Sequence, residues 1–288
     1  MSSRYDGSTK LFQIGLKPLD LAEWIDVGAD LPRYLDEKER LAATHPDEVF
    51  AAEPGTGDGQ VEVLELLAEH LPQRFPDIYR REGDTIAILP AGRTVSLYGA
   101  EPLRIAASLV QEDLVIMRKG GDGWRLAAGS LSFPSSWRLR EKFGRPIDEV
   151  HAPVPGFGAG TRNHELIARM FDHLQPRIPV LRWNWSIYND DALFHPDGEG
   201  THRGFGDGQP AFLRVERQTL RKLPRTGDIL FTIRIYVDPL EQLAHQPDAG
   251  KIAALLIEQL AGLDAEQLAY KGLTADRDRL IARLQNLE

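Results

Sequence analysis

Three blocks in the middle third of the chain place ionisable and aromatic side chains beside prolines and β-branched residues. They are IDEVHAPVPGFG at 147–158, LRWNWSIYNDDALF at 181–194 and FLRVERQTLRKLPRTGDILFTIRIYVDPL at 212–240. A chain that needed only a core would place plain apolar residues at these positions. The blocks therefore predict a polar wall around an apolar cavity.

Composition excludes several classes of protein. The 288 residues suffice for one large domain or two small ones, and 42% hydrophobic content indicates a globular core. A formal net charge of −9 disfavours nucleic acid as a partner. Cysteine is absent, so the chain by itself forms no disulfide, zinc ribbon, Cys-ligated iron–sulfur cluster or thiolate-bound haem.

The sequence offers no membrane signal. The first ten residues, MSSRYDGSTK, have no apolar signal core, and no window reaches the length of a membrane span. We expect a cytoplasmic protein without membrane association.

Periodicity predicts helices in the first quarter and at the end of the chain. Segment 36–50 is helix-prone up to Pro46, and 61–75 is amphipathic with Pro72 and Pro76 ending it. Further helices are expected at 135–144, 163–174, 249–263 and 274–287.

Strands are expected between these helices. Short β-branched runs occupy 84–89, 94–99 and 113–119, and glycines at 120–123 join the last run to 124–133 as a hairpin. Longer strands are expected at 180–187, 211–223 and 228–237. The fold class is therefore α+β: an antiparallel sheet of about five or more strands, with helices on one face and at both ends. A cavity would lie between the concave face of the sheet and the covering helices.

His151 is the first candidate ligand for a metal or a haem iron. It follows an apolar–polar, strand-like alternation that ends at Val150, and Pro153 and Pro155 restrict the backbone after it. Low backbone freedom would hold the imidazole ready for a metal. The alternative is a half-buried histidine that bonds a backbone carbonyl.

Two predicted strands carry rows of polar side chains on one face. The rows are Arg182, Asn184 and Tyr188 on one strand and Arg214, Glu216 and Gln218 on the other. They could line a cavity for a small polar or cationic ligand, or face solvent and form cross-strand ion pairs.

Other side chains in these strands are assigned to the core. Trp183 and Trp185 point away from the polar row and are interpreted as core residues.

The adjacent carboxylates Glu112 and Asp113 stand at the start of an apolar strand. One of them should face inward, where an arginine across the sheet or an amine substrate would neutralise it.

Taken together, several blocks resemble the haem-dependent oxidative N-demethylase-like family. The resemblance runs in order from about residue 11 to 243 and is carried by GLKPLD with Trp24, QEDL at 111–114, EKFG followed by HAPVPG, RWNWS at 182–186, and RVERQTLRKLPRTGDILFTIRIYV at 214–237. The Arg-x-Glu-Arg-Gln-Thr-Leu piece of the last block is the most specific.

The resemblance implies a fold of the Per-ARNT-Sim (PAS) type, an antiparallel sheet with helices around a cofactor cavity. The haem-binding core would span 76–243, with an N-terminal helical extension at 1–75 and C-terminal helices at 244–288. The family's activity would make this chain a haem b subunit of a monooxygenase. It would activate O₂ with electrons from a partner reductase and oxidise a small secondary amine to a primary amine and formaldehyde. Flavin and an iron–sulfur cluster would reside on partner subunits, which agrees with the absence of cysteine here.

The resemblance also implies roles for individual residues. His151 would be the proximal iron ligand, with His164 and His173 as alternatives. Arg182 and Asn184 would reach a haem propionate or the distal side.

The catalytic roles would fall to the Arg-x-Glu block. Arg214 would donate a hydrogen bond to bound oxygen, and Glu216 would partner an arginine or the substrate ammonium.

Two alternatives to the enzyme remain. The same scaffold could serve as a haem-binding gas or ligand sensor, or could bind another small molecule without haem. The enzyme requires a carboxylate such as Glu216 or Asp113 in the pocket, whereas a sensor should be joined to an output domain, and none is recognisable in the sequence. The terminal helices could contact the reductase or a second copy of the chain.

Overall fold

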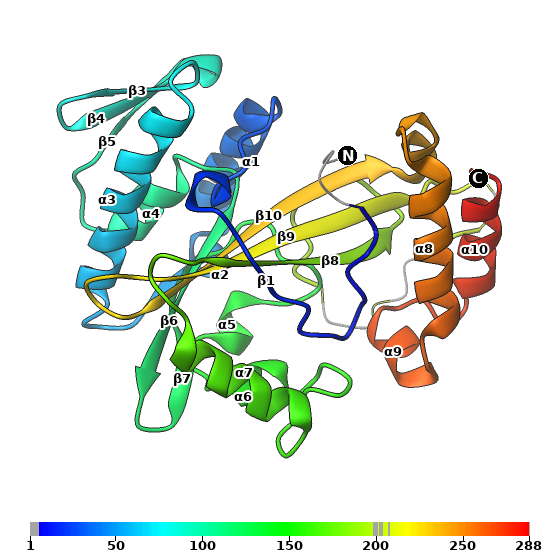
Figure 1. Cartoon of the computed structure of the whole chain (residues 1–288). Helices are drawn as coiled ribbons and strands as arrows, with labels where there is room; N and C mark the ends of the chain where they lie inside the picture. The colour runs from blue at the N-terminus through cyan, green and yellow to red at the C-terminus, as the bar shows by residue number, and fades with distance from the viewer. Residues whose placement is uncertain (1–5, 198–200, 202–203, 207, 288) are drawn as a thin grey trace.

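The computed structural model describes residues 6–197, 201, 204–206 and 208–287. Within these residues the main element is a seven-stranded sheet of order β1-β8-β9-β10-β6-β7-β2 (Figure 1). Its strands are β1 (Lys17–Pro18), β2 (Phe50–Ala52), β6 (Asp113–Gly120), β7 (Gly123–Ser130), β8 (Val180–Tyr188), β9 (Phe212–Lys222) and β10 (Ile229–Pro239).

Each pairing in this sheet is antiparallel, which confirms the predicted α+β class. The short strands predicted at 84–89 and 94–99 correspond to β4 (Thr85–Ile88) and β5 (Arg93–Ser96), which form a separate three-stranded sheet with β3 (Tyr79–Glu82), a strand that was not predicted. Residues before 76 contribute the two short edge strands β1 and β2 to the main sheet. The predicted division into 1–75, 76–243 and 244–288 stays a prediction.

Helices occupy most of the segments whose periodicity predicted them. The helical elements are η1 (Leu21–Glu23), α1 (Leu31–Thr44), α2 (Pro46–Val49), α3 (Gly57–Arg74), η2 (Leu89–Ala91), α4 (Pro102–Ala107), α5 (Leu139–Lys142), α6 (Ile147–His151), α7 (Arg162–His173), η3 (Leu240–His245), α8 (Ala249–Gly262), α9 (Ala265–Tyr270) and α10 (Arg277–Gln285). Within the described residues, no helix is long and apolar enough to cross a membrane.

Helix α3 continues through Pro72, where the sequence predicted its end. Val63, Leu67 and Leu71 are completely buried along one side of the helix. Pro72 removes one hydrogen bond in the last turn, and the burial of this apolar stripe outweighs that loss.

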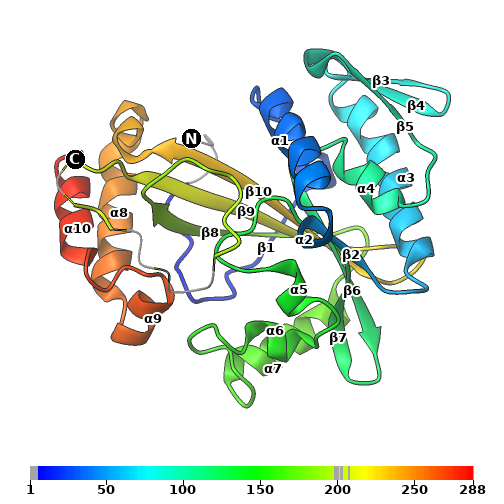
Figure 2. The same cartoon turned by 180° about the vertical axis from the view of Figure 1, so that it is seen from behind.

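Helices pack on both faces of the sheet, not on one as predicted. Leu114 and Ile116 of β6 belong to the core cluster that contains α3, whereas Val115 and Met117 belong to the cluster that contains α7. The reason is the continuous apolar run of this strand, because side chains on both faces then require cover. Figures 1 and 2 show α1 on one side of β8–β10 and α6 and α7 on the other.

The C-terminal helices cover the end of the sheet formed by β8 and β9. Trp183 and Trp185 are buried in the core cluster that also contains Leu256 of α8 and Leu280 of α10. The assignment of both tryptophans to the core is confirmed.

Glu112 and Asp113 are both buried, although only one of the two was predicted to face inward. The Asp113 oxygens accept hydrogen bonds from the backbone of Ser132 and Phe133, each at 2.8 Å. For Glu112 the main cationic neighbour is Arg234 of the adjacent strand β10, the arginine across the sheet that was predicted. For Asp113 it is Lys38, which was not predicted; the Lys38 ammonium also donates to the backbone carbonyl of Glu112 at 2.5 Å. Burial raises the pKa of Asp113 to about 6, although Lys38 opposes this.

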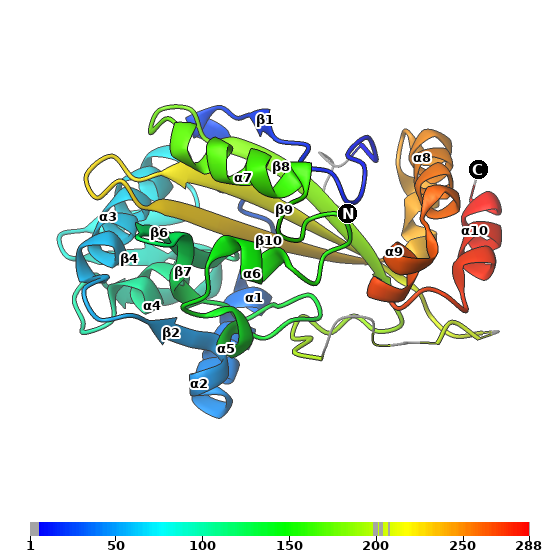
Figure 3. The ribbon, with the colours of Figure 1, turned by 90° about the horizontal axis from the view of Figure 1, so that it is seen from below.

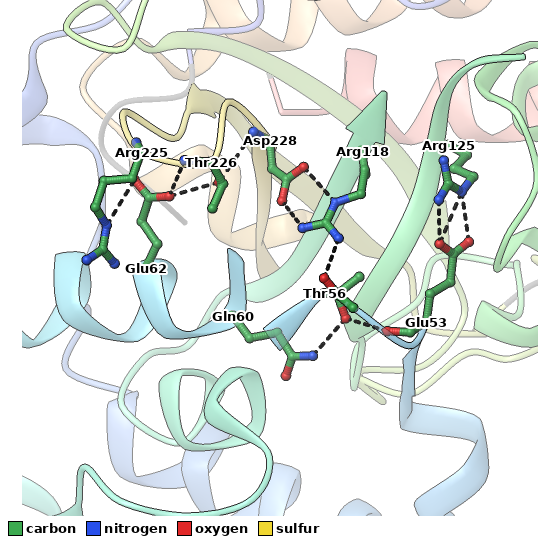
Figure 4. Close-up of polar contacts among 10 residues, drawn as sticks. Glu53, Thr56, Gln60, Glu62, Arg118, Arg125, Arg225, Thr226 and Asp228 are labelled. Atoms are coloured by element: carbon green, nitrogen blue, oxygen red, sulfur yellow. Dashed lines mark hydrogen bonds and ion pairs between the residues drawn. The ribbon is translucent and has the colours of Figure 1, made fainter. Parts of the chain in front are cut away.

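Polar contacts fix the free end of the β9–β10 hairpin (Figure 4). The Glu62 carboxylate of α3 accepts hydrogen bonds from the backbone of Arg225 at 2.7 Å and of Thr226 at 2.9 Å. Asp228 accepts two bonds from Arg118 of β6, at 2.9 and 2.6 Å. These contacts hold β9 in place, and β9 carries part of the cavity wall described next.

Candidate functional site

A cavity lies between the sheet and the helices α6 and α7, on the side of the sheet shown in Figure 3. The cavity volume is about 230 Å³, and the space free of protein atoms reaches about 1390 Å³ when the open solvent at the mouth is included. Most of the wall is apolar, with side chains from β6, β9, β10, α6, α7 and the N-terminal segment: Phe12, Ile14, Leu16, Val115, Met117, Ile147, Val150, Ile167, Met170, Phe171, Leu220, Phe231 and Ile233. A mostly apolar pocket with few polar groups is typical of a site for an organic ligand.

The sheet brings the two predicted polar rows together in this wall. Asn184 lies directly opposite Glu216, and Arg182 lies directly opposite Gln218. All four side chains line the cavity, because residues directly opposite each other point to the same face of a sheet.

A chain of polar contacts links Glu216 to Lys271. Glu216 Oε2 accepts hydrogen bonds from Asn184 Nδ2 at 3.2 Å and from Gln218 Nε2 at 2.5 Å. Asn184 Oδ1 in turn accepts a bond from Lys271 Nζ at 3.4 Å. The Asn184 amide therefore lies between a carboxylate and an ammonium group and contacts both.

Lys271 follows α9 and was missed by the sequence analysis. Its ammonium also donates to the Trp185 carbonyl at 2.9 Å and to Ser186 Oγ at 3.0 Å. Burial lowers its pKa to about 8, with Glu216 opposing the shift and Arg182 adding to it. No pattern in the sequence pairs this residue with β8, because α9 is a short helix without a strong apolar period.

Arg182 is a cation without a hydrogen-bond partner among the described residues. Its Nε atom is inaccessible to solvent and makes no hydrogen bond. Burial lowers the pKa of the guanidinium, and the Glu216 carboxylate opposes that shift. A buried arginine with unused donors is a favourable place for an anionic group of a ligand.

His151 lies at the end of helix α6, where a strand-like segment was predicted. Pro146 is the N-cap of this helix and has an extended backbone, and the chain turns helical at Ile147. A turn follows, in which the backbone N–H of Val154 donates to the carbonyl of His151 at 2.9 Å. The prediction of a strand up to Val150 was therefore wrong.

The His151 ring lines the cavity and is neutral at physiological pH. Burial and, to a smaller extent, the nearby charges of Lys142 and Arg182 lower its pKa to about 4. A backbone hydrogen bond to Ile147 opposes the shift. An imidazole with one nitrogen bonded to a carbonyl can present its other nitrogen to a metal.

The other two candidate histidines lie outside the cavity lining. His164 is in the first turn of α7, and its backbone N–H bonds to Thr161 Oγ1. His173 is exposed, and its Nδ1 is 2.6 Å from the Arg169 carbonyl. Among the described residues, His151 is the one histidine that lines the cavity.

Arg214 points to the cavity face of β9, but its guanidinium is bound to two neighbouring segments, residues 133–135 and 192–193. It donates to Ser135 Oγ at 2.9 Å, and to the carbonyls of Phe133 and Leu193 at 3.0 Å each. Further bonds reach the carbonyls of Ala192 and Pro134. Arg214 is not part of the lining, and its predicted bond to an iron-bound ligand stays a prediction.

Positive charge predominates in the cavity wall. Lys142, Arg182 and Lys271 are the lining cations, and Glu216 is the single carboxylate among the described lining residues. No group of three histidine, aspartate or glutamate side chains in the described part of the chain could hold a bare metal ion. A single histidine with several cations around it is better able to bind a metal that is held in an anionic organic cofactor than to bind a free metal ion.

The fold and the cavity define an α+β protein with a mostly apolar pocket beneath an antiparallel sheet. Residues 15–281 match the family model described as haem-dependent oxidative N-demethylase, alpha subunit-like, and the chain belongs to this family. The match extends past residue 243, where the resemblance in the sequence ended. It therefore includes the C-terminal segment that contributes Lys271 to the cavity.

Proposed function

We propose that this chain is the haem-binding subunit of an oxidative N-demethylase-type monooxygenase that acts on a small secondary amine. The observation that carries the proposal is the neutral His151 ring beside the cations Lys142 and Arg182 in a mostly apolar cavity. The membership of the haem-dependent family supports it. The sheet with its covering helices is consistent with the PAS-type fold that the resemblance implies.

The residues in the cavity fit haem b. An iron needs a neutral imidazole, and two propionates need cationic partners. The three lining cations exceed the single carboxylate by two charges, which equals the charge of two propionates. The buried, unpartnered Nε of Arg182 is a donor that a propionate would satisfy.

We assign His151 as the iron ligand, with Ile147 fixing the ring through its backbone. Arg182 and Lys142 would bind the propionates, and Asn184 would orient the polar groups around them. Apolar side chains such as Val115, Phe231 and Ile233 would exclude water from the reacting centre.

The bound haem would supply the activation of O₂. In the overall reaction, a methylated secondary amine, O₂, two electrons and two protons give a primary amine, formaldehyde and water. The electrons would come from a partner reductase that carries flavin and an iron–sulfur cluster. In this chain, the carboxylate of Glu216 would bind the substrate ammonium.

Glu216 also favours an enzyme over a gas sensor. A sensor pocket requires donors for a diatomic ligand and has no need of a carboxylate. Glu216 lines the cavity and is 8% exposed, whereas Asp113, the other candidate, is bound to backbone N–H groups.

A titration with haem b and with haem dimethyl ester tests this proposal. The ester keeps the iron and the macrocycle but lacks the propionate charges. We expect a Soret band with haem b and roughly ten- to hundred-fold weaker binding of the ester, the effect of losing charge-assisted hydrogen bonds. Arg182→Gln should reduce this preference, and Arg140→Gln, on the exposed side of α5, should not. The absence of any haem band in the wild-type protein would contradict the proposal.

A further inference from the structure

The proposed function leaves open which secondary amine the cavity accepts. Resting on that function, we propose that the substrate is a secondary amine that also carries a carboxylate, an N-methyl amino acid. Glu216 would bind its ammonium and Lys271 its carboxylate.

The two charges are close together but do not form an ion pair. The Asn184 amide lies between them, 3.2 Å from Glu216 Oε2 and 3.4 Å from Lys271 Nζ. Each charge is thus held in the cavity wall with the opposite charge about one amide group away. A zwitterion whose charges are separated by one or two carbon atoms matches this spacing.

Both groups retain bonding capacity for a ligand. Glu216 Oε2 accepts both amide bonds, and Oε1 accepts none from the described residues. The bond from Lys271 to Asn184 is its longest, near the outer limit for a hydrogen bond, so a carboxylate oxygen could replace it.

The charge balance favours a zwitterion over a simple ammonium ion. Ferrous haem b has a net charge of −2, carried by its two propionates, so when it is bound it balances the wall formed by Lys142, Arg182, Lys271 and Glu216. A dimethylammonium ion would then add one uncompensated positive charge to an apolar cavity, which is costly. An N-methyl amino acid adds none.

The position of Lys271 also orients such a substrate. Lys271 and Tyr270 lie at the end of α9, and Tyr270 packs edge-on against Phe12, with 5.8 Å between the ring centroids. All three side chains line the cavity. The substrate carboxylate would therefore point to the α9 end, and its N-methyl group would extend toward the apolar wall.

For N-methylglycine the reaction balances as follows. N-methylglycine, O₂, two electrons and two protons give glycine, formaldehyde and water. The C–N bond to the methyl group breaks, the methyl carbon leaves oxidised as formaldehyde, and the reductase of the proposed function supplies the electrons.

Isothermal titration calorimetry on the haem-loaded full chain tests the inference. The probes are N-methylglycine, N-methylglycinamide, which lacks the carboxylate charge, and dimethylamine. We compare wild type with Lys271→Met and with the matched control Lys251→Met, an exposed lysine of α8. The ratio of two affinities within one variant is independent of the fraction that folds.

We expect wild type to bind N-methylglycine at least tenfold more tightly than either other probe. Lys271→Met should abolish this preference, and Lys251→Met should preserve it. Equal or tighter binding of dimethylamine or the amide by wild type would overturn the inference, as would a preference that survives Lys271→Met. The Soret band of the same sample separates the two proposals: a missing band contradicts the haem function, whereas a normal band without the preference contradicts only the substrate assignment.

Discussion

Asn184 and Glu216 lie directly opposite each other on β8 and β9, and the amide nitrogen of Asn184 is 3.2 Å from Glu216 Oε2. Because this amide separates Glu216 from Lys271, Asn184→Leu should allow the two charges to form a direct ion pair. We expect the affinity for a secondary amine to fall about tenfold, since the carboxylate is then occupied. Calorimetry measures this, with Asn163→Leu, outside the cavity lining, as the control. An unchanged affinity in Asn184→Leu would refute the role of the amide.

Arg214→Lys distinguishes two roles for the arginine of β9. Lysine keeps the charge but cannot reproduce the fork that bonds the Phe133 and Leu193 carbonyls. We expect the free energy of unfolding in urea to fall by about 2 kcal/mol, while the stretching frequency of carbon monoxide on the haem stays constant. A frequency shift at unchanged stability would instead support the predicted hydrogen bond to an iron-bound ligand.

Asp228→Ala tests the anchor of the β9–β10 hairpin. Asp228 is 4% exposed, and removing it leaves the Arg118 guanidinium without its two bonds. We expect a loss of about 3 kcal/mol in the free energy of unfolding. Asp47→Ala removes the partner of the exposed Arg140 and should cost less than about 1 kcal/mol. Equal effects of the two substitutions would contradict this account of the hairpin.

Asp113 predicts a pH dependence of stability. Burial raises its pKa to about 6 in the folded protein, although Lys38 opposes the shift, and the unfolded value is about 3.9. The folded state thus binds the carboxyl proton of Asp113 more tightly than the unfolded state does. The stability that this proton contributes is present below about pH 4 and is lost as the pH rises through 6. The stability of wild type relative to Asp113→Asn should therefore fall by about 2 kcal/mol between pH 4 and 7.

Denaturation in urea across this pH range measures the difference in the free energy of unfolding between wild type and Asp113→Asn. Asp191→Asn, at an exposed position, serves as the control and should show no such trend. A constant difference between wild type and Asp113→Asn would show that the carboxyl titrates normally.

Local patterns in the sequence predicted much of the fold and part of the site. The alternation of Arg182 and Asn184 with Trp183 and Trp185 assigned the polar and the core face of β8, because side chains alternate along a strand. The expected single face of helices failed, since the apolar run of β6 is compatible with burial on both sides.

Features that depend on distant segments could not be predicted in this way. Lys271 reaches Asn184 from a short helix 87 residues further along the chain. Lys38 reaches Glu112 from α1, 74 residues earlier. Arg214 looked available for a ligand, and only the tertiary structure reveals the carbonyl groups that occupy it.

The central claim is that the imidazole of His151 binds the haem iron. The most direct test is the absorption spectrum of the full chain reconstituted with haem, for wild type, His151→Ala and the control His164→Ala. We predict that His151→Ala loses or markedly shifts the Soret band and that His164→Ala retains the wild-type spectrum. A Soret band that is unchanged in His151→Ala would contradict the account.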